Sequence, residues 1–113
     1  MVPNGSISSI RNVSGARGDG EKTYEGNSIT VTIPCRIDEP SSFARTDAAQ
    51  RGIELDSMLV VSRFAIAGAD AEIKQGTLIE ASSPVGDANG EVVELRARNN
   101  DLVEVRIGQK VSA

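Results

Sequence analysis

The residue types that most often do chemistry in proteins are scarce in this chain of 113 residues. It contains no histidine and a single cysteine, Cys35. Ser-His-Asp and Cys-His nucleophilic pairs, histidine-based zinc sites and internal disulfides all need residues that the sequence lacks. Cys35 lies on the apolar side of an alternating segment, which predicts a small core residue rather than a nucleophile. The composition therefore favours a binding or structural module over an enzyme.

Closely spaced acidic residues are the remaining candidates for catalysis or metal binding. Glu54 and Asp56 stand two apart, as the acid/base pair of a glycosidase could, but a chain with so few aromatic residues can hardly build a sugar-stacking cleft. Asp87, Asn89 and Glu91 resemble calcium-loop ligands, yet the series ends before a sixth ligand appears. We expect solvated charges at the first site and turn residues at the second, and hence no catalytic residues, cofactor or metal.

The segment 14–27 is rich in glycine and charged residues. Its glycines are not followed by the Gly-Lys-Ser/Thr that a phosphate-binding loop requires. The tripeptide Arg17-Gly18-Asp19 matches an integrin adhesion motif, but that role needs an extracellular protein. We interpret the segment as an exposed, flexible loop, in which Arg17 and Asp19 could contact neighbouring subunits.

A second polar segment, Asp38–Asp56, is long for a compact domain, and such loops commonly have a function. It contains one aromatic residue, Phe43, with Arg45 and Arg51 nearby. Phenylalanine combined with arginine is typical of protein interfaces. Two interpretations stay open for Phe43: an interface anchor, or a plug that folds back into the end of the core. The segment itself could be irregular, an extended arm, or a short helix from Phe43 to Arg51 that ends at Gly52.

These segments must be positioned by strands, because the aliphatic residues are mainly β-branched: 11 Val and 10 Ile against 5 Leu. From Ile29 to Ile37 apolar and polar residues alternate strictly, which predicts a strand with one buried face. Pro34 has no N–H to donate and favours a sheet edge or a bulge for this strand. The spacing of Ile7, Ile10 and Val13 is compatible with a first strand but fits a period of three as well as of two.

The second half of the chain predicts further strands separated by turns. A β-hairpin is expected across Asn99-Asn100-Asp101, and in its second arm Val103, Val105 and Ile107 should face the core, with Glu104 and Arg106 outward. The dipeptide Asn89-Gly90 predicts another turn. The strands are expected over residues 57–66, 77–81, 91–98 and 102–107.

Together these elements predict an all-β fold in one domain over residues 1–113. The expected architecture is a small antiparallel β-barrel or sandwich of about 5–7 strands, with one long loop that could hold a short helix. The segments 1–6, 14–27, 38–56 and 109–113 are expected to be flexible.

Several sequence segments follow one another in an order that is similar to that of a known protein family. A strand ends in Ile33-Pro34-Cys35-Arg36-Ile37-Asp38-Glu39-Pro40, a polar loop follows, and the turn from Ala69 to Ile79 is similar to the pattern Asp-Ile-Lys-x-Gly-Asp-x-Ile. This order resembles the small head-completion proteins of tailed bacteriophages, the head-tail joining or stopper family. The likeness is one of pattern and length over Ile7–Gly108. The chain departs from the family pattern by Thr77, where an Asp is usual, and by an extra residue before Ile73.

The resemblance implies a β-barrel subunit that forms a homo-oligomeric ring beneath the portal, helps to close the channel after DNA packaging and gives the tail a docking platform. It implies the portal or an adaptor and tail proteins as partners, with no catalytic residues or cofactors. It also implies a place in the virion neck after synthesis in the cytoplasm of the bacterial host. DNA would only pass through the channel, and the net charge of −4 provides no basic excess for sequence-specific binding. No stretch is long and apolar enough for a membrane span.

Two alternatives remain open. The segment Ile73–Ile79 also resembles the turn of biotin or lipoyl carrier domains, although Lys74 lacks the Met or Asp neighbours of a modified lysine. This would indicate a small β-barrel binding or carrier-like module of a bacterial protein. A different virion role, as a minor tail or capsid-decorating protein, would use the same β-rich composition.

Overall fold

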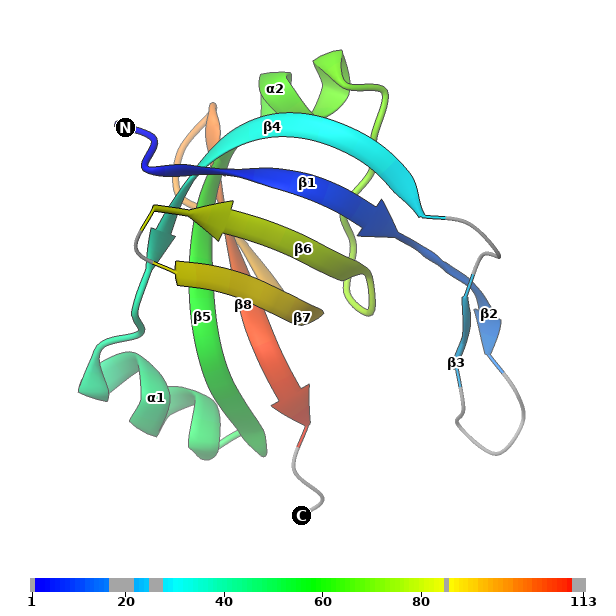
Figure 1. Cartoon of the computed structure of the whole chain (residues 1–113). Helices are drawn as coiled ribbons and strands as arrows, with labels where there is room; N and C mark the ends of the chain where they lie inside the picture. Colours follow the sequence, from blue (N-terminus) through cyan, green and yellow to red (C-terminus); the bar gives the residue numbers. More distant parts are fainter. Residues whose placement is uncertain (1, 17–21, 25–27, 85, 111–113) are drawn as a thin grey trace.

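A computed structural model describes residues 2–16, 22–24, 28–84 and 86–110 and confirms the expected all-β barrel. Six antiparallel strands close into a barrel in the order β1-β4-β5-β8-β7-β6 (Figure 1). These strands are β1 Gly5–Arg11, β4 Ile29–Asp38, β5 Ile53–Ser62, β6 Leu78–Ser83, β7 Gly86–Ala97 and β8 Leu102–Lys110. The remaining elements are the short strands β2 Val13–Ala16 and β3 Lys22–Tyr24 and the helices α1 Ser42–Ala49 and α2 Arg63–Gly68.

The interior of the barrel is a solid core of mainly β-branched side chains. A barrel of so few strands has room for side chains and none for an internal channel. The cluster of buried residues comes from all six barrel strands: Ile7, Ile10, Val31, Ile33, Cys35, Leu59, Val61, Ile79, Ala81, Ala88, Val92, Val105 and Ile107.

Strand β4 confirms the predicted alternation in its centre, where Val31, Ile33 and Cys35 are buried. At its ends Ile29 is 40% exposed and Ile37 is only partly buried. The expectation of a sheet edge at Pro34 is wrong, since β4 lies between β1 and β5. Pro34 is tolerated there because pairing with β5 begins only at the next residue, where Cys35 faces Val61.

Shifts in strand register decide which side chains enter the core. In β1 a shift falls between Ile7 and Ser9, so Ile7 and Ile10 are both fully buried although they stand three apart. This bulge is the reason that their spacing fits no regular strand. In β7 the register shifts between Val92 and Glu94. Val92 therefore faces the core opposite Ile107, whereas Glu94, two residues later, pairs with Arg106 on the outer wall.

The strand expected over 57–66 is wrong at both ends. Strand β5 begins earlier, at Ile53, and stops at Ser62, where helix α2 begins. The Ser62 hydroxyl accepts a hydrogen bond from the Ala65 backbone N–H at 3.4 Å and caps the helix. The apolar residues at 64–66 therefore belong to a second helix, which the sequence did not predict.

The turn expected at Asn89-Gly90 is also wrong. Both residues lie within β7, where they pair with Glu80 and Ile79 of β6. The hairpin closes instead between Ser83 and Gly86. Gly90 is useful inside the strand, because a Cβ at this position would come within 2.8 Å of the Ile107 side chain.

Most of the segments expected to be flexible contain regular structure. Residues 38–56 hold α1 and the first residues of β5. Near the N-terminus, the Asn4 amide bonds both ways to the Ile37 backbone, accepting from its N–H at 2.7 Å and donating to its carbonyl oxygen at 3.0 Å. Residues 109 and 110 belong to β8. Arg17 and Asp19 lie outside the described residues.

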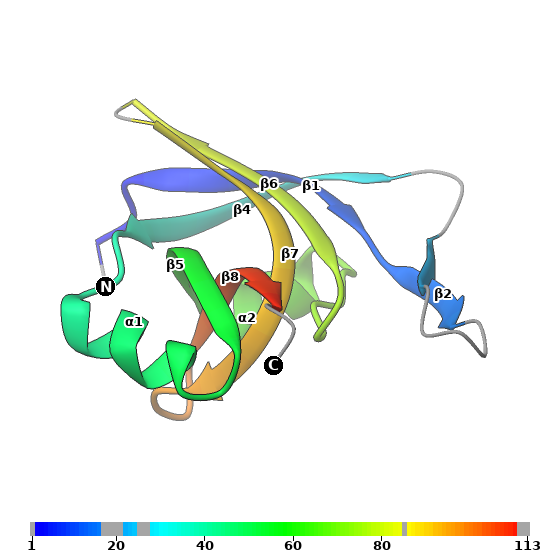
Figure 2. The ribbon, with the colours of Figure 1, turned by 90° about the horizontal axis from the view of Figure 1, so that it is seen from below.

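Three features stand outside the ring of strands: the sheet of β2 and β3, helix α1 and helix α2. The sheet formed by β2 and β3 continues from the end of β1 and lies to one side of the barrel (Figure 1). Seen from below, α1 lies outside the barrel next to β5 (Figure 2). Helix α2 lies at the opposite end of the molecule from α1, above the barrel in Figure 1.

Candidate functional site

Helix α1 presents the residues that the sequence singled out. Its N-terminus is capped by Ser41, whose hydroxyl accepts from the Ala44 N–H at 3.1 Å. After the helix the chain turns at Gly52, which has a φ of 72° that favours glycine. The short helix expected from Phe43 to Arg51 is confirmed, although it ends two residues earlier, at Ala49. It gives Phe43 a fixed place on the surface.

The inner side of α1 packs against the outer wall of the barrel. Ala44 and Ala48 are buried, and their small side chains let the helix approach the strands closely. They form an apolar cluster outside the barrel core, here called the outer cluster, with residues of β5 and β7: Ile53, Leu55, Met58 and Val93.

Phe43 is 81% exposed, so the interpretation that it plugs the end of the core is wrong. Arg45 is also exposed, and its Nε donates to the Pro40 carbonyl oxygen at 3.3 Å. The outer surface of α1 thus includes both side chains, which lie about 200° apart around the helix axis because they stand two residues apart. This surface is available to another molecule, which keeps the interface interpretation of Phe43 and Arg45 open.

Arg51 is engaged within the molecule. Its guanidinium contacts the Glu94 carboxylate at 2.8 Å and the Asp47 carboxylate at 3.1 Å. Asp47 also lies 3.5 Å from Arg96 of β7. Of the three candidate residues in this segment, Arg51 therefore attaches α1 to the barrel wall. Phe43 and Arg45 are exposed to solvent.

The charged contacts continue onto β8, where the structure departs from expectation. Glu104 and Arg106 point away from the core as predicted, but they are 7% and 6% exposed rather than solvated. Arg106 Nε donates to Glu104 at 2.7 Å, Arg98 contacts the same carboxylate at 2.8 Å, and Arg106 reaches Glu94 at 3.4 Å. Seven side chains thus form one outer ion-pair chain: Arg98, Glu104, Arg106, Glu94, Arg51, Asp47 and Arg96.

The ionisation of Glu104 follows from this setting. Burial by itself would raise the pKa of its carboxyl, but hydrogen bonds from Arg106 and Arg98 and the charges of both arginines outweigh that effect. The pKa of Glu104 is therefore lowered from its ordinary value. The carboxylate stays charged at neutral pH, as an ion-paired structural group does.

Cys35 is fully buried in the barrel core. Burial raises the pKa of its thiol to about 11, because the thiolate would lose its hydration. The thiol is thus protonated at neutral pH and shielded from reagents, which confirms Cys35 as a small core residue.

A second apolar surface lies beside α2, in the part that was expected to be strand. Phe64 is 69% exposed, while Ala65 and Ile66 pack against the barrel core. Next to them is a groove of about 320 Å³, here called the α2 groove, lined by Arg63, Ile66, Ala67, Ala71, Ile73, Leu95 and Val103. The sequence did contain a signal for this helix: a capping serine followed by an alanine-rich stretch.

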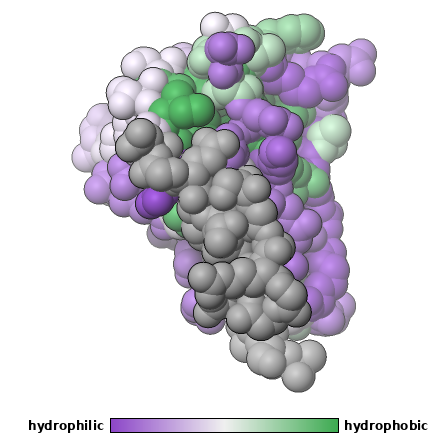
Figure 3. Space-filling view, turned by 90° about the vertical axis from the view of Figure 1, so that its right-hand side faces the viewer, coloured by the Kyte–Doolittle hydropathy of each residue, from purple (hydrophilic) through white to green (hydrophobic). Residues whose placement is uncertain are grey.

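Among the coloured atoms on the face of the molecule shown in Figure 3, hydrophilic ones predominate. Hydrophobic atoms gather mainly in its upper half, toward the end at which α2 lies in Figure 1.

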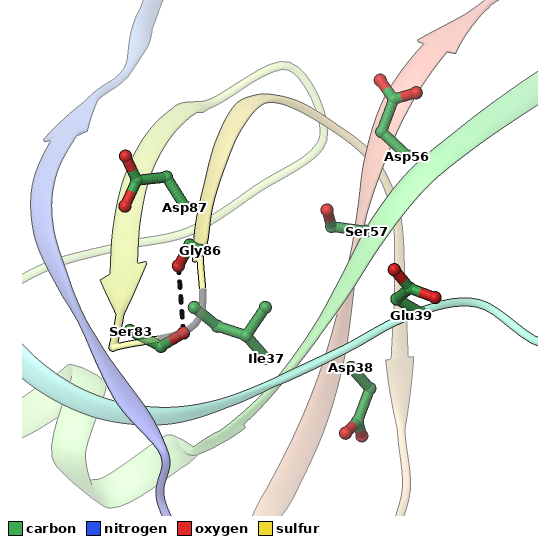
Figure 4. A pocket seen from close by; sticks show the side chains of 8 residues that line it. All are labelled: Ile37, Asp38, Glu39, Asp56, Ser57, Ser83, Gly86 and Asp87. Atoms are coloured by element: carbon green, nitrogen blue, oxygen red, sulfur yellow. Dashed lines mark hydrogen bonds between the residues drawn. The ribbon is translucent and has the colours of Figure 1, made fainter.

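A polar depression at the other end of the barrel gathers several acidic residues. It is lined by Ile37, Asp38, Glu39, Asp56, Ser57, Ser83, Gly86 and Asp87. Its carboxylates are spread around the depression and do not converge (Figure 4). In the described part of the chain, no group of three or more acidic or cysteine side chains is placed to hold a metal ion.

The acidic pairs considered from the sequence are not brought together. Glu54 accepts a hydrogen bond from Gln109 at 3.3 Å, whereas Asp56 lines the polar depression. Asn89 is used inside the sheet, where its side-chain oxygen accepts from the Ala81 N–H at 3.2 Å. These contacts are structural, and none of them assembles an acid/base pair.

Comparison of the chain with protein-family models, with curated proteins and with solved structures found no match. Among the described residues, no helix is both long enough and apolar enough to cross a membrane. The surfaces of the molecule itself therefore have to support any functional proposal.

Proposed function

We propose that the chain is a structural subunit of a bacteriophage neck, which joins the DNA-filled head to the tail as part of a homo-oligomeric ring. The observation that supports it best is the exposed Phe43 on a helix that is clamped to the wall of a closed barrel. Such a surface is suited to contact with another protein and contains no reactive group.

The closed barrel restricts how subunits could associate. In the described part of the chain each of the six strands pairs with two neighbours, although β4 and β5 are paired only over Cys35–Asp38 of β4. Closure of the barrel therefore restricts strand addition. Association would then mainly use side-chain surfaces outside the barrel, or the small β2–β3 sheet that lies beside it (Figure 1). Phe43 with Arg45 has the composition of an interface hot spot.

The packed interior also bears on how DNA would pass. Because apolar side chains fill the barrel, a channel through one subunit is sterically impossible. DNA would pass through the centre of a ring of subunits, closed by head-to-tail contacts between two different surfaces of each copy. The net charge of −4 would keep such a channel from binding DNA tightly.

The proposal is tested by native mass spectrometry and electron microscopy of the purified full chain, over concentrations from micromolar to millimolar. We expect closed rings of one size, with about six or twelve subunits. The double variant Phe43→Ala/Arg45→Ala should lose the rings while its circular dichroism and thermal unfolding stay unchanged. A wild-type chain that remains monomeric throughout would contradict the proposal.

The alternative is a small β-barrel binding module, and the α2 groove is the observation that favours it. A carrier role through Lys74 has weaker support, because the ammonium of this residue lies 3.6 Å from Glu72 in a loop beside α2. A binding module would stay monomeric and would take up apolar peptides or small molecules at the groove. The same mass measurement therefore separates the two functions.

A further inference from the structure

The α2 groove is the depression best suited to an aromatic side chain. Its walls are mainly aliphatic, from Ile66, Ala67, Ile73, Leu95 and Val103. Two other depressions are lined largely by polar and charged residues, including Asp56 and Asp87 in one case and Arg51, Glu94 and Lys110 in the other. An aromatic ring that entered either of these two depressions would remove their polar groups from water. The desolvation cost would be smaller in the α2 groove, because fewer polar groups line it.

Phe43 exposes a large apolar surface that such a groove could bury. It is 81% exposed, the highest exposure among the described large hydrophobic residues, and α1 cannot turn it inward because Ala44 and Ala48 already occupy the buried side of the helix. Phe43 belongs to α1 and the groove is lined by residues of α2, and these two helices lie at opposite ends of the molecule (Figure 1). The groove can therefore receive Phe43 only from a second copy.

The charges around the two surfaces are complementary. Arg45 and Glu39 flank Phe43 in the sequence, and both are exposed. On the other surface Arg63 lines the groove, and Glu72, with 70% of its side chain exposed, stands in the chain between the groove residues Ala71 and Ile73. Glu72 is already paired with Lys74 at 3.6 Å, so the groove surface carries two cations, Arg63 and Lys74, and one carboxylate. The additional cation beside the groove can pair with the exposed Glu39 of another copy.

We infer that Phe43 of one copy inserts into the α2 groove of the next copy, and that this contact links the subunits head to tail. The inference rests on the proposed function, because it names the contact through which the subunits of the ring associate. A linear oligomer built by this contact has a free Phe43 surface at one end and a free α2 groove at the other. Association therefore continues until these two ends meet and a ring closes.

The test uses three variants of the full chain at exposed positions. Phe43→Ala removes the inserted side chain, and Leu95→Lys places a charge in the groove. Phe64→Ala is the matched control, because Phe64 is also an exposed phenylalanine on a short helix but does not line the groove. Self-association is measured by sedimentation equilibrium, with thermal unfolding of each variant as a check on folding.

We expect Phe43→Ala and Leu95→Lys each to weaken self-association at least tenfold, as loss of a hot spot does, and Phe64→Ala to change it less than about twofold. An equimolar mixture of Phe43→Ala and Leu95→Lys should form a one-to-one dimer and nothing larger. Phe43→Ala keeps an intact groove, and Leu95→Lys keeps its Phe43. Phe43 of the Leu95→Lys variant can therefore insert into the groove of the Phe43→Ala variant, and no second contact can form.

The outcomes separate this inference from the proposed function. Rings that persist in Phe43→Ala, or that are lost only in Phe64→Ala, would contradict the inference. They would still support the proposed function as a ring subunit. Open filaments that depend on Phe43 support the contact and contradict the ring. A wild-type chain that never associates contradicts both.

Discussion

The helices α1 and α2 begin with the same local sequence and end in different environments. Both contain Ser-x-Phe-Ala: Ser41 to Ala44 in α1 and Ser62 to Ala65 in α2. In both, the serine hydroxyl accepts from the N–H of the alanine three residues later, and the phenylalanine points to solvent. The shared sequence thus specifies a capped helix with an exposed aromatic residue, and it does not specify what the helix packs against.

The two packing environments differ in chemistry. Helix α1 lies on the outer wall, on a small apolar cluster, and is tied down through Arg51 and the outer ion-pair chain. Helix α2 lies over one end of the barrel, where Ala65 and Ile66 pack against the main core. We therefore expect charge changes to loosen α1, and apolar truncations to loosen α2.

The largest effect is expected at the buried centre of the ion-pair chain. Arg106→Ala should lower the free energy of unfolding by about 3 kcal/mol, because Glu104 would lose its closest partner while remaining buried. Chemical denaturation measures this loss. Arg96→Ala, at the exposed end of the chain, is the control and should cost less than about 0.5 kcal/mol. Equal losses in the two variants would show that burial does not govern these contacts.

Acid should weaken the same region. The pKa of Glu104 is lowered in the folded protein, so its contribution to stability is present above the ordinary carboxyl pKa and is lost as the pH falls through the lowered one. Between pH 7 and about pH 5 this group should leave the stability unchanged, and below about pH 4 it should reduce it. Glu104→Gln should be less stable than wild type at neutral pH, and the difference should narrow in acid. A constant difference from pH 7 to pH 3 would contradict this assignment.

The apolar attachment of α2 predicts a smaller loss. Ile66→Ala should cost about 2 kcal/mol, at the low end for a truncated isoleucine, because Ile66 is only partly buried. It should raise amide hydrogen exchange in α2 and leave α1 unchanged. Faster exchange in both helices would mean that the two attachments are not independent.

The serine caps allow the finest comparison. Ser41→Ala should cost about 1 kcal/mol. Ser62→Ala should cost somewhat more although its capping bond is longer, because the Ser62 hydroxyl also donates to Asp101 Oδ1 at 2.6 Å. Thermal unfolding of the two variants side by side measures the difference. A larger loss at Ser41 would indicate that the bond to Asp101 contributes little.

The barrel was predictable because its signals are local. The alternation over Ile29–Ile37 and the abundance of Val and Ile follow directly from a strand with one face on a core. Register shifts leave no such signal in the sequence. That Ile7 and Ile10 both face the core could therefore be seen only in the structure. Helix α2 was missed because the apolar run before it continued the pattern of a strand, although its Ser-x-Phe-Ala start is the same as in the predicted α1.

The candidate site was predicted in part. Phe43 and Arg45 do lie on a short, exposed helix, as their polar surroundings indicated. The engagement of Arg51 with Glu94 and the burial of Glu104 and Arg106 depend on residues distant in the sequence. A polar residue on the outward face of a strand becomes buried when other side chains cover that face, and no single-strand pattern reveals this.

The most direct test of the account is covalent capture of the proposed contact between copies. A full chain with Ser42→Cys and Ala67→Cys would place one exposed thiol beside Phe43 and one in the α2 groove. The natural Cys35 would not interfere, because it is buried and its thiol pKa is raised to about 11. A short, flexible bis-maleimide should not join the two sites within one molecule, since the helices that carry them, α1 and α2, lie at opposite ends of it (Figure 1).

We predict that the double variant gives a ladder of covalent dimers and higher oligomers, whereas each single variant gives little beyond monomer. A double variant that stays monomeric after cross-linking, with both thiols fully labelled, would contradict the account.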